Sequence, residues 1–332
     1  MLRILALIFL TVGCVSAFGC GSDVFKNVTA LLYRDPKSNY TLKTVTDYKR
    51  DFQNVHRVDV EPINKISRLC RNSVTDLPKL HTLSLILNGI ESIEAGSFGN
   101  LPALRVLKLN FNGLSEIKAG TFNLPLEELY LSSNKIYKIE SKALDDMPSL
   151  RLLDLSFNHI QYIDNTWFQA APKLSHVDFS FNLIREIPKS AFSNLAKLNH
   201  KVDLSLMNNT ISTVNRDAFL GFSGLGKLWL GANKIRFLDD NTFSNVKGLD
   251  TLQLDNNQMF CLSDRFLTNT RTSEVHLIGN PIICNCLVKV EEWGLASNTK
   301  VFNSNRNLDK CKYKARYPET TTKAPEGVAI DL

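Results

Sequence analysis

The stretch LRLLDLSFNHI, residues 150–160, decides the fold because its spacing returns along most of the chain. Counted from Leu150 as position 0, positions 0, 3, 5 and 10 are apolar, and position 8 is Asn158. The same frame contains Asn88, Asn112, Asn134, Asn158, Asn182, Asn209, Asn233, Asn257 and Asn280. Their intervals are 24, 22, 24, 24, 27, 24, 24 and 23 residues. A period of this length predicts a solenoid of stacked turns.

The frame has a physical explanation in strand stacking. Positions 3 and 5 alternate with exposed positions, which is the periodicity of a strand. One such strand cannot bury its leucines alone, but it completes a parallel sheet when it stacks about 4.8 Å from its neighbour. Position 8 turns inward, where leaving a backbone group unpaired costs about 1–3 kcal/mol. An asparagine amide both donates and accepts hydrogen bonds, so it satisfies those groups.

A phenylalanine recurs in the second half of most repeats, in the segment that leads back to the next strand. In the repeat of Asn134 this position is Leu144. The column consists of Phe98, Phe122, Phe168, Phe192, Phe219, Phe243 and Phe266. We interpret it as core packing on the outer side of the solenoid.

Two irregularities interrupt the period. The interval of 27 residues belongs to the sixth repeat, where Lys201 stands in place of a leucine. That insertion predicts a bulge or a short loop. Before the repeats, Val55, Val58 and Val60 predict a degenerate first strand, although Ile63 takes the asparagine position. We expect this strand to cover the edge of the sheet.

These residues resemble the extracellular 24-residue class of the leucine-rich-repeat superfamily, whose pattern is LxxLxLxxNxIxxIxxxxFxxLxx. The resemblance covers about residues 73–283. It implies an α/β solenoid, a right-handed horseshoe of nine to ten repeats with a parallel concave sheet and disulfide-bearing caps. The segment NPIICNC at 280–286, followed by Trp293, resembles the superfamily's C-terminal cap. That cap usually carries four cysteines, whereas three follow the last repeat here.

The first residues predict export from the cell. Arg3 is charged, Ile4–Val12 is apolar, and Val15-Ser16-Ala17 is a small-residue cleavage site, as in a secretory signal peptide. The apolar run is too short to span a bilayer, and a lipoprotein reading of Cys14 is weaker. We therefore expect a released, extracellular protein. The expected domains are a signal peptide over 1–17, an N-terminal cap over 18–72, repeats over 73–283, a C-terminal cysteine cap over 284–316 and a disordered Thr/Pro tail over 317–332.

Six cysteines follow the expected cleavage site, and an even number in a secreted chain predicts disulfides. Cys261 and Cys284 both occupy position 12 in neighbouring repeats, which places them within disulfide reach. The predicted disulfides are Cys261–Cys284, Cys286–Cys311 and Cys20–Cys70. A zinc site is disfavoured because the spacing is not CxxC and no paired histidine follows.

The sequence also predicts sites of glycosylation and a basic segment. Asn27, Asn39 and Asn208 stand in Asn-x-Thr triplets that predict N-glycosylation, and a glycan on Asn208 would divide the concave surface. The chain has a net charge of +6. Much of it lies near Cys311, in Arg306, Lys310, Lys312, Lys314 and Arg316. This segment predicts weak binding to polyanions, although a solvated tail is the simpler interpretation.

Catalytic motifs are not convincing. The segment 221–228 nearly spells a phosphate-binding loop, but Leu228 replaces the final Ser/Thr and the segment belongs to a repeat strand. His176 and Asp178 share one face of a strand, yet calcium needs six or more oxygen ligands. No nucleophile has a base at a workable spacing. We predict a non-enzyme without cofactor, metal or nucleic acid.

Positions 2, 4 and 7 of the frame are expected to face the concave side. They combine an acidic run in the central repeats with phenylalanines at the strand ends. The candidate ligand-binding residues are Phe111, Glu128, Tyr130, Asp154, Phe157, His176, Asp178, Phe181, Asp203 and Trp229. Aromatic side chains beside charges are typical of interface centres, so we expect a protein or glycan ligand with a basic, partly apolar patch. The alternatives are phenylalanines packed against loops and carboxylates that serve solubility.

The architecture is similar to that of secreted arthropod leucine-rich immune and adhesion proteins. The resemblance implies a secreted recognition protein, with a role in innate immunity. Two other functions remain open. One is an extracellular-matrix or cell-adhesion component, and the other is a secreted inhibitor of an enzyme or receptor. The oligomeric state also stays open, because concave faces and cap edges can both pair.

Overall fold

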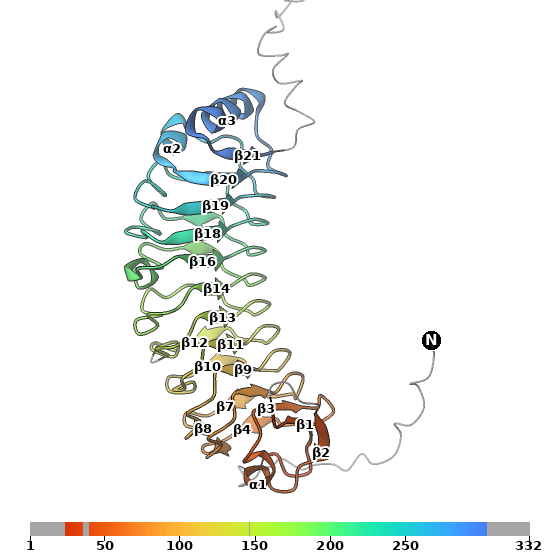
Figure 1. Ribbon diagram of the computed structural model, residues 1–332. Coiled ribbons are helices and arrows are strands. Elements are labelled where there is room, and N and C mark those ends of the chain that lie inside the picture. The colour runs from red at the N-terminus through yellow and green to blue at the C-terminus, as the bar shows by residue number, and fades with distance from the viewer. Residues whose placement is uncertain (1–23, 36–39, 146, 304–332) are drawn as a thin grey trace, which may run out of the picture.

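A computed structural model describes residues 24–35, 40–145 and 147–303 as an arc of stacked turns (Figure 1). One sheet of 13 strands runs along the arc in the order β2-β1-β3-β6-β9-β11-β13-β14-β16-β18-β19-β20-β21. The nine repeats supply its consecutive parallel strands β6 (Thr82–Ser84), β9 (Val106–Lys108), β11 (Glu128–Tyr130), β13 (Leu152–Asp154), β14 (His176–Asp178), β16 (Val202–Ser205), β18 (Leu225–Trp229), β19 (Leu249–Gln253) and β20 (Thr272–His276). The parallel solenoid predicted from the asparagine period is therefore confirmed.

Register follows the leucine frame. Leu153 lies opposite Leu129 on one side and Val177 on the other, and all three side chains are buried. The flanking positions of the frame stay partly exposed on the concave side. Each fully buried leucine contributes roughly 1.5–3 kcal/mol, so the stacking of repeats rather than any single repeat stabilises the fold.

The asparagine ladder connects every pair of neighbouring repeats. Asn158 Nδ2 donates to the carbonyls of Leu131 (3.0 Å), Leu155 (3.1 Å) and Ser156 (3.0 Å). Its Oδ1 accepts from the Ile136 N–H at 2.9 Å. Equivalent bonds recur from Asn112 to Asn257. The amides thus satisfy inward-facing backbone groups that water cannot reach.

The N-terminal end closes the sheet with antiparallel strands. β1 (Thr29–Tyr33) pairs with β2 (Thr41–Thr44) and with β3 (Arg57–Val60), and β3 pairs in parallel with β6. The short helix α1 (Tyr48–Phe52) packs its buried face beneath them. Ile63, at the asparagine position of the frame, is exposed. The amide Nδ2 of the next residue, Asn64, donates to the Thr29 carbonyl at 3.0 Å. The cap strand therefore has its own asparagine contact, shifted by one residue.

The convex side is built from short pairs and a buried aromatic column. The pairs are β4 (Arg68–Leu69) with β7 (Ser92–Ile93), β5 (Val74–Thr75) with β8 (Phe98–Gly99), β10 (Glu116–Ile117) with β12 (Lys138–Ile139), and β15 (Glu186–Ile187) with β17 (Thr213–Val214). The seven phenylalanines of the predicted column are all buried. Phe192, Phe219 and Phe243 follow at ring separations of 5.7 and 5.4 Å. Their interpretation as core is confirmed.

The long sixth repeat contains the predicted irregularity. The 3-10 helix η1 (Leu195–Lys197) precedes β16, and the pairing of β16 with β18 shifts register between Val202 and Leu204. Val202 is fully buried, whereas Lys201 is exposed. The extra residues therefore place a valine, not Lys201, in the core.

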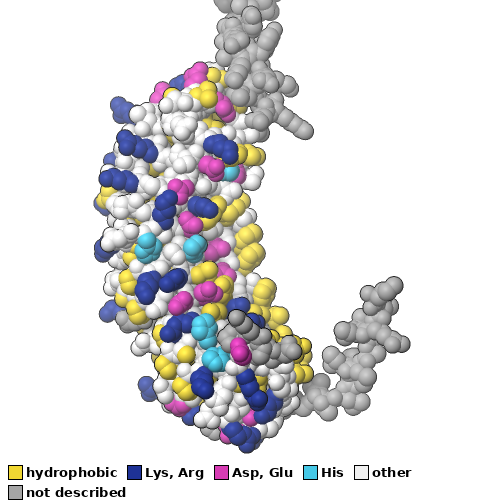
Figure 2. Space-filling view, viewed as in Figure 1, with side chains coloured by type: hydrophobic (Ala, Val, Ile, Leu, Met, Phe, Trp, Pro, Cys, Tyr) yellow, Lys and Arg dark blue, Asp and Glu magenta, His cyan; other side chains and the backbone are white. Residues whose placement is uncertain are grey.

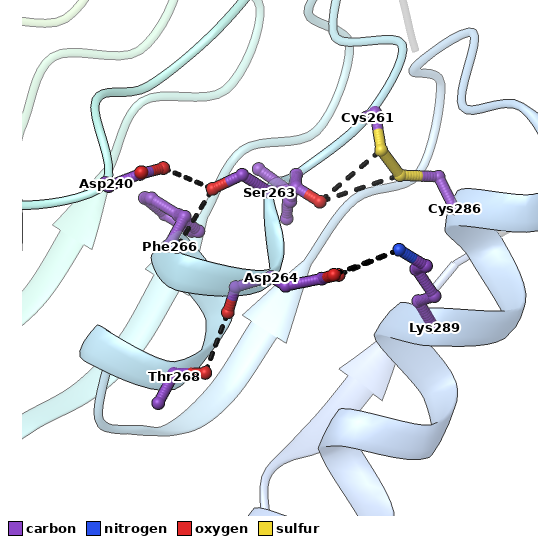
Figure 3. A network of polar contacts seen from close by, with 9 residues as sticks. Asp240, Cys261, Ser263, Asp264, Phe266, Thr268, Cys286 and Lys289 are labelled. Atoms are coloured by element: carbon purple, nitrogen blue, oxygen red, sulfur yellow. Dashed lines mark hydrogen bonds and ion pairs between the residues drawn. A yellow bond between two sulfur atoms is a disulfide. The ribbon is translucent and has the colours of Figure 1, made fainter.

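The C-terminal end is covered by α2 (Asp264–Asn269), α3 (Cys284–Ser297) and β21 (Lys300–Phe302). Figure 3 shows how they join: Lys289 Nζ lies 3.0 and 3.1 Å from the carboxylate oxygens of Asp264. Ser263 Oγ caps α2 by accepting from the Phe266 N–H at 3.0 Å, and it donates to Asp240. These contacts tie the cap helices to the last repeats.

The disulfide at this end corrects the predicted pairing. Cys261 is joined to Cys286, with 5.4 Å between their Cα atoms, so Cys261–Cys284 and Cys286–Cys311 are both wrong. The repeat period does align Cys284 with Cys261, since Ile283 N–H donates to the Phe260 carbonyl at 3.0 Å. However, α3 begins at Cys284, and its first turn directs the buried Cys286 inward. Cys70 and Cys284 each take part in a further disulfide. Cys20 and Cys311 lie outside the described residues.

Candidate functional site

The centre of the concave face contains a shallow hollow of about 280 Å³. It extends from β11 to β18 and lies over the repeats that carry the predicted acidic run. Its lining includes seven residues of the frame, namely Tyr130, Leu152, Asp154, His176, Asp178, Asp203 and Trp229. The strand register explains this gathering, because Asp154 lies opposite both Tyr130 and Asp178. Six of the ten predicted site residues therefore share one surface.

Tyr130 and Glu128 form a polar pair at one end of this hollow. Tyr130 Oη donates to Glu128 Oε2 at 2.9 Å. Burial, then the hydrogen bond and charge of Glu128 and the charge of Asp154, raise the pKa of Tyr130 to about 12. The phenol therefore stays neutral at neutral pH and can donate its hydrogen bond to Glu128.

Asp203, His176 and Trp229 form the other end. Asp203 Oδ1 accepts from the Lys227 N–H at 2.9 Å, and His176 Nε2 lies 3.6 Å from Asp203 Oδ2. Lys227 Nζ lies 5.9 Å from the centre of a Trp229 ring. This end thus presents a carboxylate and an indole to the same space.

Asp154 and Asp178 hold the turns that follow their strands. Asp154 Oδ1 accepts from the N–H (3.0 Å) and Oγ (2.7 Å) of Ser156. Asp178 Oδ1 accepts from the Ser180 N–H at 2.7 Å. The sequence repeats this unit as DLSFN at 154–158 and DFSFN at 178–182. One oxygen of each carboxylate is therefore committed to the turn that follows its strand.

These turns carry Phe157 and Phe181, whose rings stack with 4.1 Å between centroids and 8° between planes. About half of each side chain is exposed, 51% and 44%. Phe111, in the same column, is also exposed. The phenylalanine stack therefore stands free at the edge of the hollow instead of filling the core.

The backbone makes this placement costly. Position 7 is left-handed in every repeat, with φ between 51° and 59° for its non-glycine residues Leu87, Phe111, Ser133, Phe157, Phe181, Asn208, Ala232 and Asn256. Glycine or asparagine adopts such φ values with little strain, whereas for a bulky residue this backbone conformation costs roughly 1–2 kcal/mol of free energy. The fold alone therefore gives no reason for phenylalanine at this position.

Sequence reasoning missed two contributors to this surface. Leu152 adds an apolar patch inside the hollow, and Ser156 with Ser180 fixes the turns beneath the phenylalanine stack. The duplicated D-x-S-F-N unit was the signal that could have revealed the serines.

The other predicted sites are distributed as follows. Asn27 is exposed and Asn208 is half-buried, while Asn39 lies outside the described residues. The expected signal peptide, the basic segment near Cys311 and the tail lie outside them too. Within the described ranges, no group of three or more metal-ligating side chains comes together. No helix in that part of the chain is long and apolar enough to cross a membrane.

The sheet register, the asparagine ladder and the exposed inner face define a leucine-rich-repeat solenoid. The family model described as leucine rich repeat matches residues 62–114, 102–160, 151–200 and 202–259, which together exceed half of the chain. The chain belongs to this leucine-rich-repeat family.

Solved structures agree with the fold. One chain of the crystal structure of the mouse RP105/MD-1 complex is 21% identical, with a TM-score of 0.59, and 70% of this chain covers 40% of it. A chain in the octameric complex of Latrophilin 3, Unc5D and FLRT2 is 24% identical, with a TM-score of 0.55. There, 73% of this chain covers 67% of the other. These likenesses concern the fold alone. No curated protein matches the sequence.

Proposed function

We propose that the protein is a secreted, non-catalytic recognition protein that binds a protein ligand across the centre of its concave face. One observation carries the proposal. The exposed stack of Phe157 and Phe181 lies beside the acidic hollow, although its backbone conformation disfavours bulky residues. Aromatic anchors next to charges are the usual centres of protein interfaces.

The chemistry of the surface supports a ligand with basic side chains. Glu128, Asp203 and the free oxygens of Asp154 and Asp178 favour lysine or arginine side chains. A strand rises about 3.3 Å per residue, and Phe157 and Phe181 follow Asp154 and Asp178 by three residues, so the phenylalanine stack lies within about 10 Å of these two carboxylates. An arginine can therefore place its guanidinium near an acid while its stem lies on an aromatic face. We infer a ligand with a basic, partly apolar segment.

Other features support the setting. Cys261–Cys286 is a disulfide, and disulfides persist in oxidising compartments such as the extracellular space. RP105 and FLRT2 occur in structures together with other proteins, namely MD-1 for the first and Latrophilin 3 and Unc5D for the second. These observations favour binding of a protein, in host defence or in adhesion.

A peptide-display selection tests the proposal. A random library is selected on the wild-type protein, and the recovered peptides are measured against Phe157→Ala/Asp178→Ala. We expect a consensus rich in Lys or Arg and apolar residues, with affinity reduced at least about tenfold in the double variant. A selection without such a consensus, or equal affinity for both proteins, would contradict the proposal.

A matched control separates recognition from folding. Phe237 is an exposed phenylalanine, and Asp239 Oδ1 accepts from the Asn241 N–H at 2.9 Å, so Phe237→Ala/Asp239→Ala removes the same groups away from the hollow. The control should keep wild-type affinity. Leu155→Ala, at a fully buried position, should cost about 2–5 kcal/mol and reduce secretion. If the Phe157 double variant reduces secretion to the same extent, its residues are structural.

A further inference from the structure

A row of positive charges follows the opposite edge of the concave sheet, where the chain enters each strand. We call it the basic rim, and it consists of Lys79, Arg105, Arg151, Lys173, Lys197, Lys201, Lys247 and Arg271. In the view of Figure 2, Lys and Arg side chains gather along the left edge and hydrophobic side chains along the right edge. Acidic side chains lie between them, together with some Lys, Arg and His side chains. The two edges of the concave side therefore differ in chemistry, and the strands between them carry mixed charge with most of the acids.

Most cations of the basic rim have no ion pair, although Lys79 Nζ donates to Asn54 Oδ1 and Lys197 Nζ donates to Asn194 Oδ1. Arg105 lies 3.7 Å from Glu127, and Lys201 pairs with Asp250. The other six have no ion-pair partner among the described residues, and all six are exposed, namely Lys79, Arg151, Lys173, Lys197, Lys247 and Arg271. A fold that needed these charges for stability would pair them, as it pairs the buried Asp51 with Lys43.

Backbone hydrogen bonds align the entry of β13 with its neighbours. Arg151 N–H donates to the Glu127 carbonyl at 2.8 Å, and Ser175 N–H donates to the Arg151 carbonyl at 2.9 Å. Position 1 of consecutive repeats therefore stacks about 4.8 Å apart. Arg151 stands at this position, Lys173 lies two residues before it in the next repeat, and Lys197 ends η1 ahead of β16. These three residues of consecutive repeats, which we call the central triad, follow one edge of the sheet without sharing one register position.

The seventh repeat interrupts the row. Its entry contains Gly224 and Gly226, and a Cβ on Gly226 would lie 2.6 Å from Asp203 Oδ1. Lys201 reaches past this repeat to Asp250 on the eighth. The third repeat also lacks a cation and carries Glu127 at its entry. The basic rim is thus divided into Lys79 with Arg105, the central triad with Lys201, and a C-terminal pair, Lys247 and Arg271.

The acidic hollow does not cancel the basic rim. Asp154 follows Arg151 by three residues along an extended strand, which is about 10 Å. The Debye length at physiological salt is about 8 Å, so solvent ions screen much of this attraction. The acids instead repel a polyanion from the hollow and confine it to the edge.

We propose that the basic rim binds an extended sulfated polysaccharide. Single cations one repeat apart match a linear chain with closely spaced sulfates better than a compact anion. Within the described strand entries of the basic rim, no Phe, Tyr or Trp side chain is exposed, so the large stacking platforms that usually hold nucleic-acid bases are missing. This ligand class rests on the proposed extracellular location. The polysaccharide and the basic protein ligand would occupy different parts of the concave side, and both could bind at once.

Heparin binding at 150 mM NaCl tests the proposal, using the full chain and immobilised heparin. The test variant is Arg151→Glu/Lys173→Glu/Lys197→Glu. The control is Lys135→Glu/Arg185→Glu/Lys234→Glu, which changes net charge equally at three exposed residues after the strands that have no ion-pair partner among the described residues. We expect the rim variant to bind at least about tenfold more weakly and the control to stay within about twofold of wild type. Residues 306–316 are present in every variant and contribute equally.

Several outcomes would overturn the proposal. Wild-type protein that does not bind heparin, or equal losses in both variants, would show that the basic rim is only a solvated surface. Tighter binding to a DNA duplex of the same charge would contradict the ligand class. If Glu substitutions prevent secretion, the matched Gln triples are measured instead. The two proposals fail separately, because the rim variant should retain the selected peptides and Phe157→Ala/Asp178→Ala should retain heparin.

Discussion

Replacing Asn158 by alanine should destabilise the protein chiefly through one orphaned backbone N–H. The three carbonyls that Asn158 serves each keep another donor: Asn134 Nδ2 for Leu131, Asn182 Nδ2 for Leu155 and the Ser133 N–H for Ser156. The Ile136 N–H has only Asn158 Oδ1, at 2.9 Å. Leaving that buried donor unpaired costs about 1–3 kcal/mol, and three weakened contacts add to it. We expect a loss of about 2–4 kcal/mol in the free energy of unfolding.

Asn88 provides an internal comparison. Its Nδ2 donates to the carbonyls of Val60 and Ile86, but its buried Oδ1 has no hydrogen-bond partner. Asn88→Ala therefore leaves no backbone N–H orphaned. It should cost about 1–3 kcal/mol less than Asn158→Ala.

Urea unfolding followed by circular dichroism measures both changes, with the exposed Asn199→Ala as a surface control. Hydrogen exchange at the Ile136 N–H provides a local readout. If Asn158→Ala costs no more than Asn199→Ala, or if Asn88→Ala costs as much as Asn158→Ala, the account of the ladder is wrong.

Three further predictions concern charge and crosslinking. Burial opposes ionisation of Asp51, but hydrogen bonds from Lys43 and from the Thr46 and Asp47 N–H groups hold its pKa well below the usual range. Its stabilising contribution should be present above about pH 4 and decline as the pH falls further, so Asp51→Asn should flatten the acid limb of a urea-stability profile. An ultraviolet titration should show one tyrosine that ionises at about pH 12, and this step should be absent from Tyr130→Phe. Changing Cys261 and Cys286 to serine should cost about 2–4 kcal/mol, and peptide mapping should find the two cysteines joined in the native protein.

The asparagine period predicted the fold because it reports a constraint that every turn shares. Asn158 and its equivalents must face inward, so their spacing fixes the rise, the register and the parallel sheet together. The same reasoning placed Asp154 opposite Asp178, as the structure shows.

The period could not predict features that depend on side-chain direction. It aligned Cys284 with Cys261, but the start of α3 directs Cys286 toward Cys261 instead. It identified Asp154 as a ligand-facing acid without revealing that Ser156 takes one of its oxygens. These details depend on helix starts and turn geometry rather than on repeat spacing.

The sequence analysis did not predict the basic rim because it considered too few positions of the frame. Only positions 2, 4 and 7 were expected to face the ligand, whereas Arg151 and Lys173 stand at positions 1 and −1. Attention to the two residues on either side of position 0 would have found them, because a basic residue recurs in this short window in most repeats.

Hydroxyl-radical footprinting of the protein with the tightest selected peptide tests the central claim most directly, because it reports which exposed aromatic rings the ligand covers. Phe157 and Phe181 should lose reactivity on binding, together with Tyr130 in the hollow. Phe237 and Tyr137, exposed outside the hollow, should react as they do in the free protein. Protection of Phe237 or Tyr137 with Phe157 and Phe181 unchanged would place the ligand elsewhere and contradict the account.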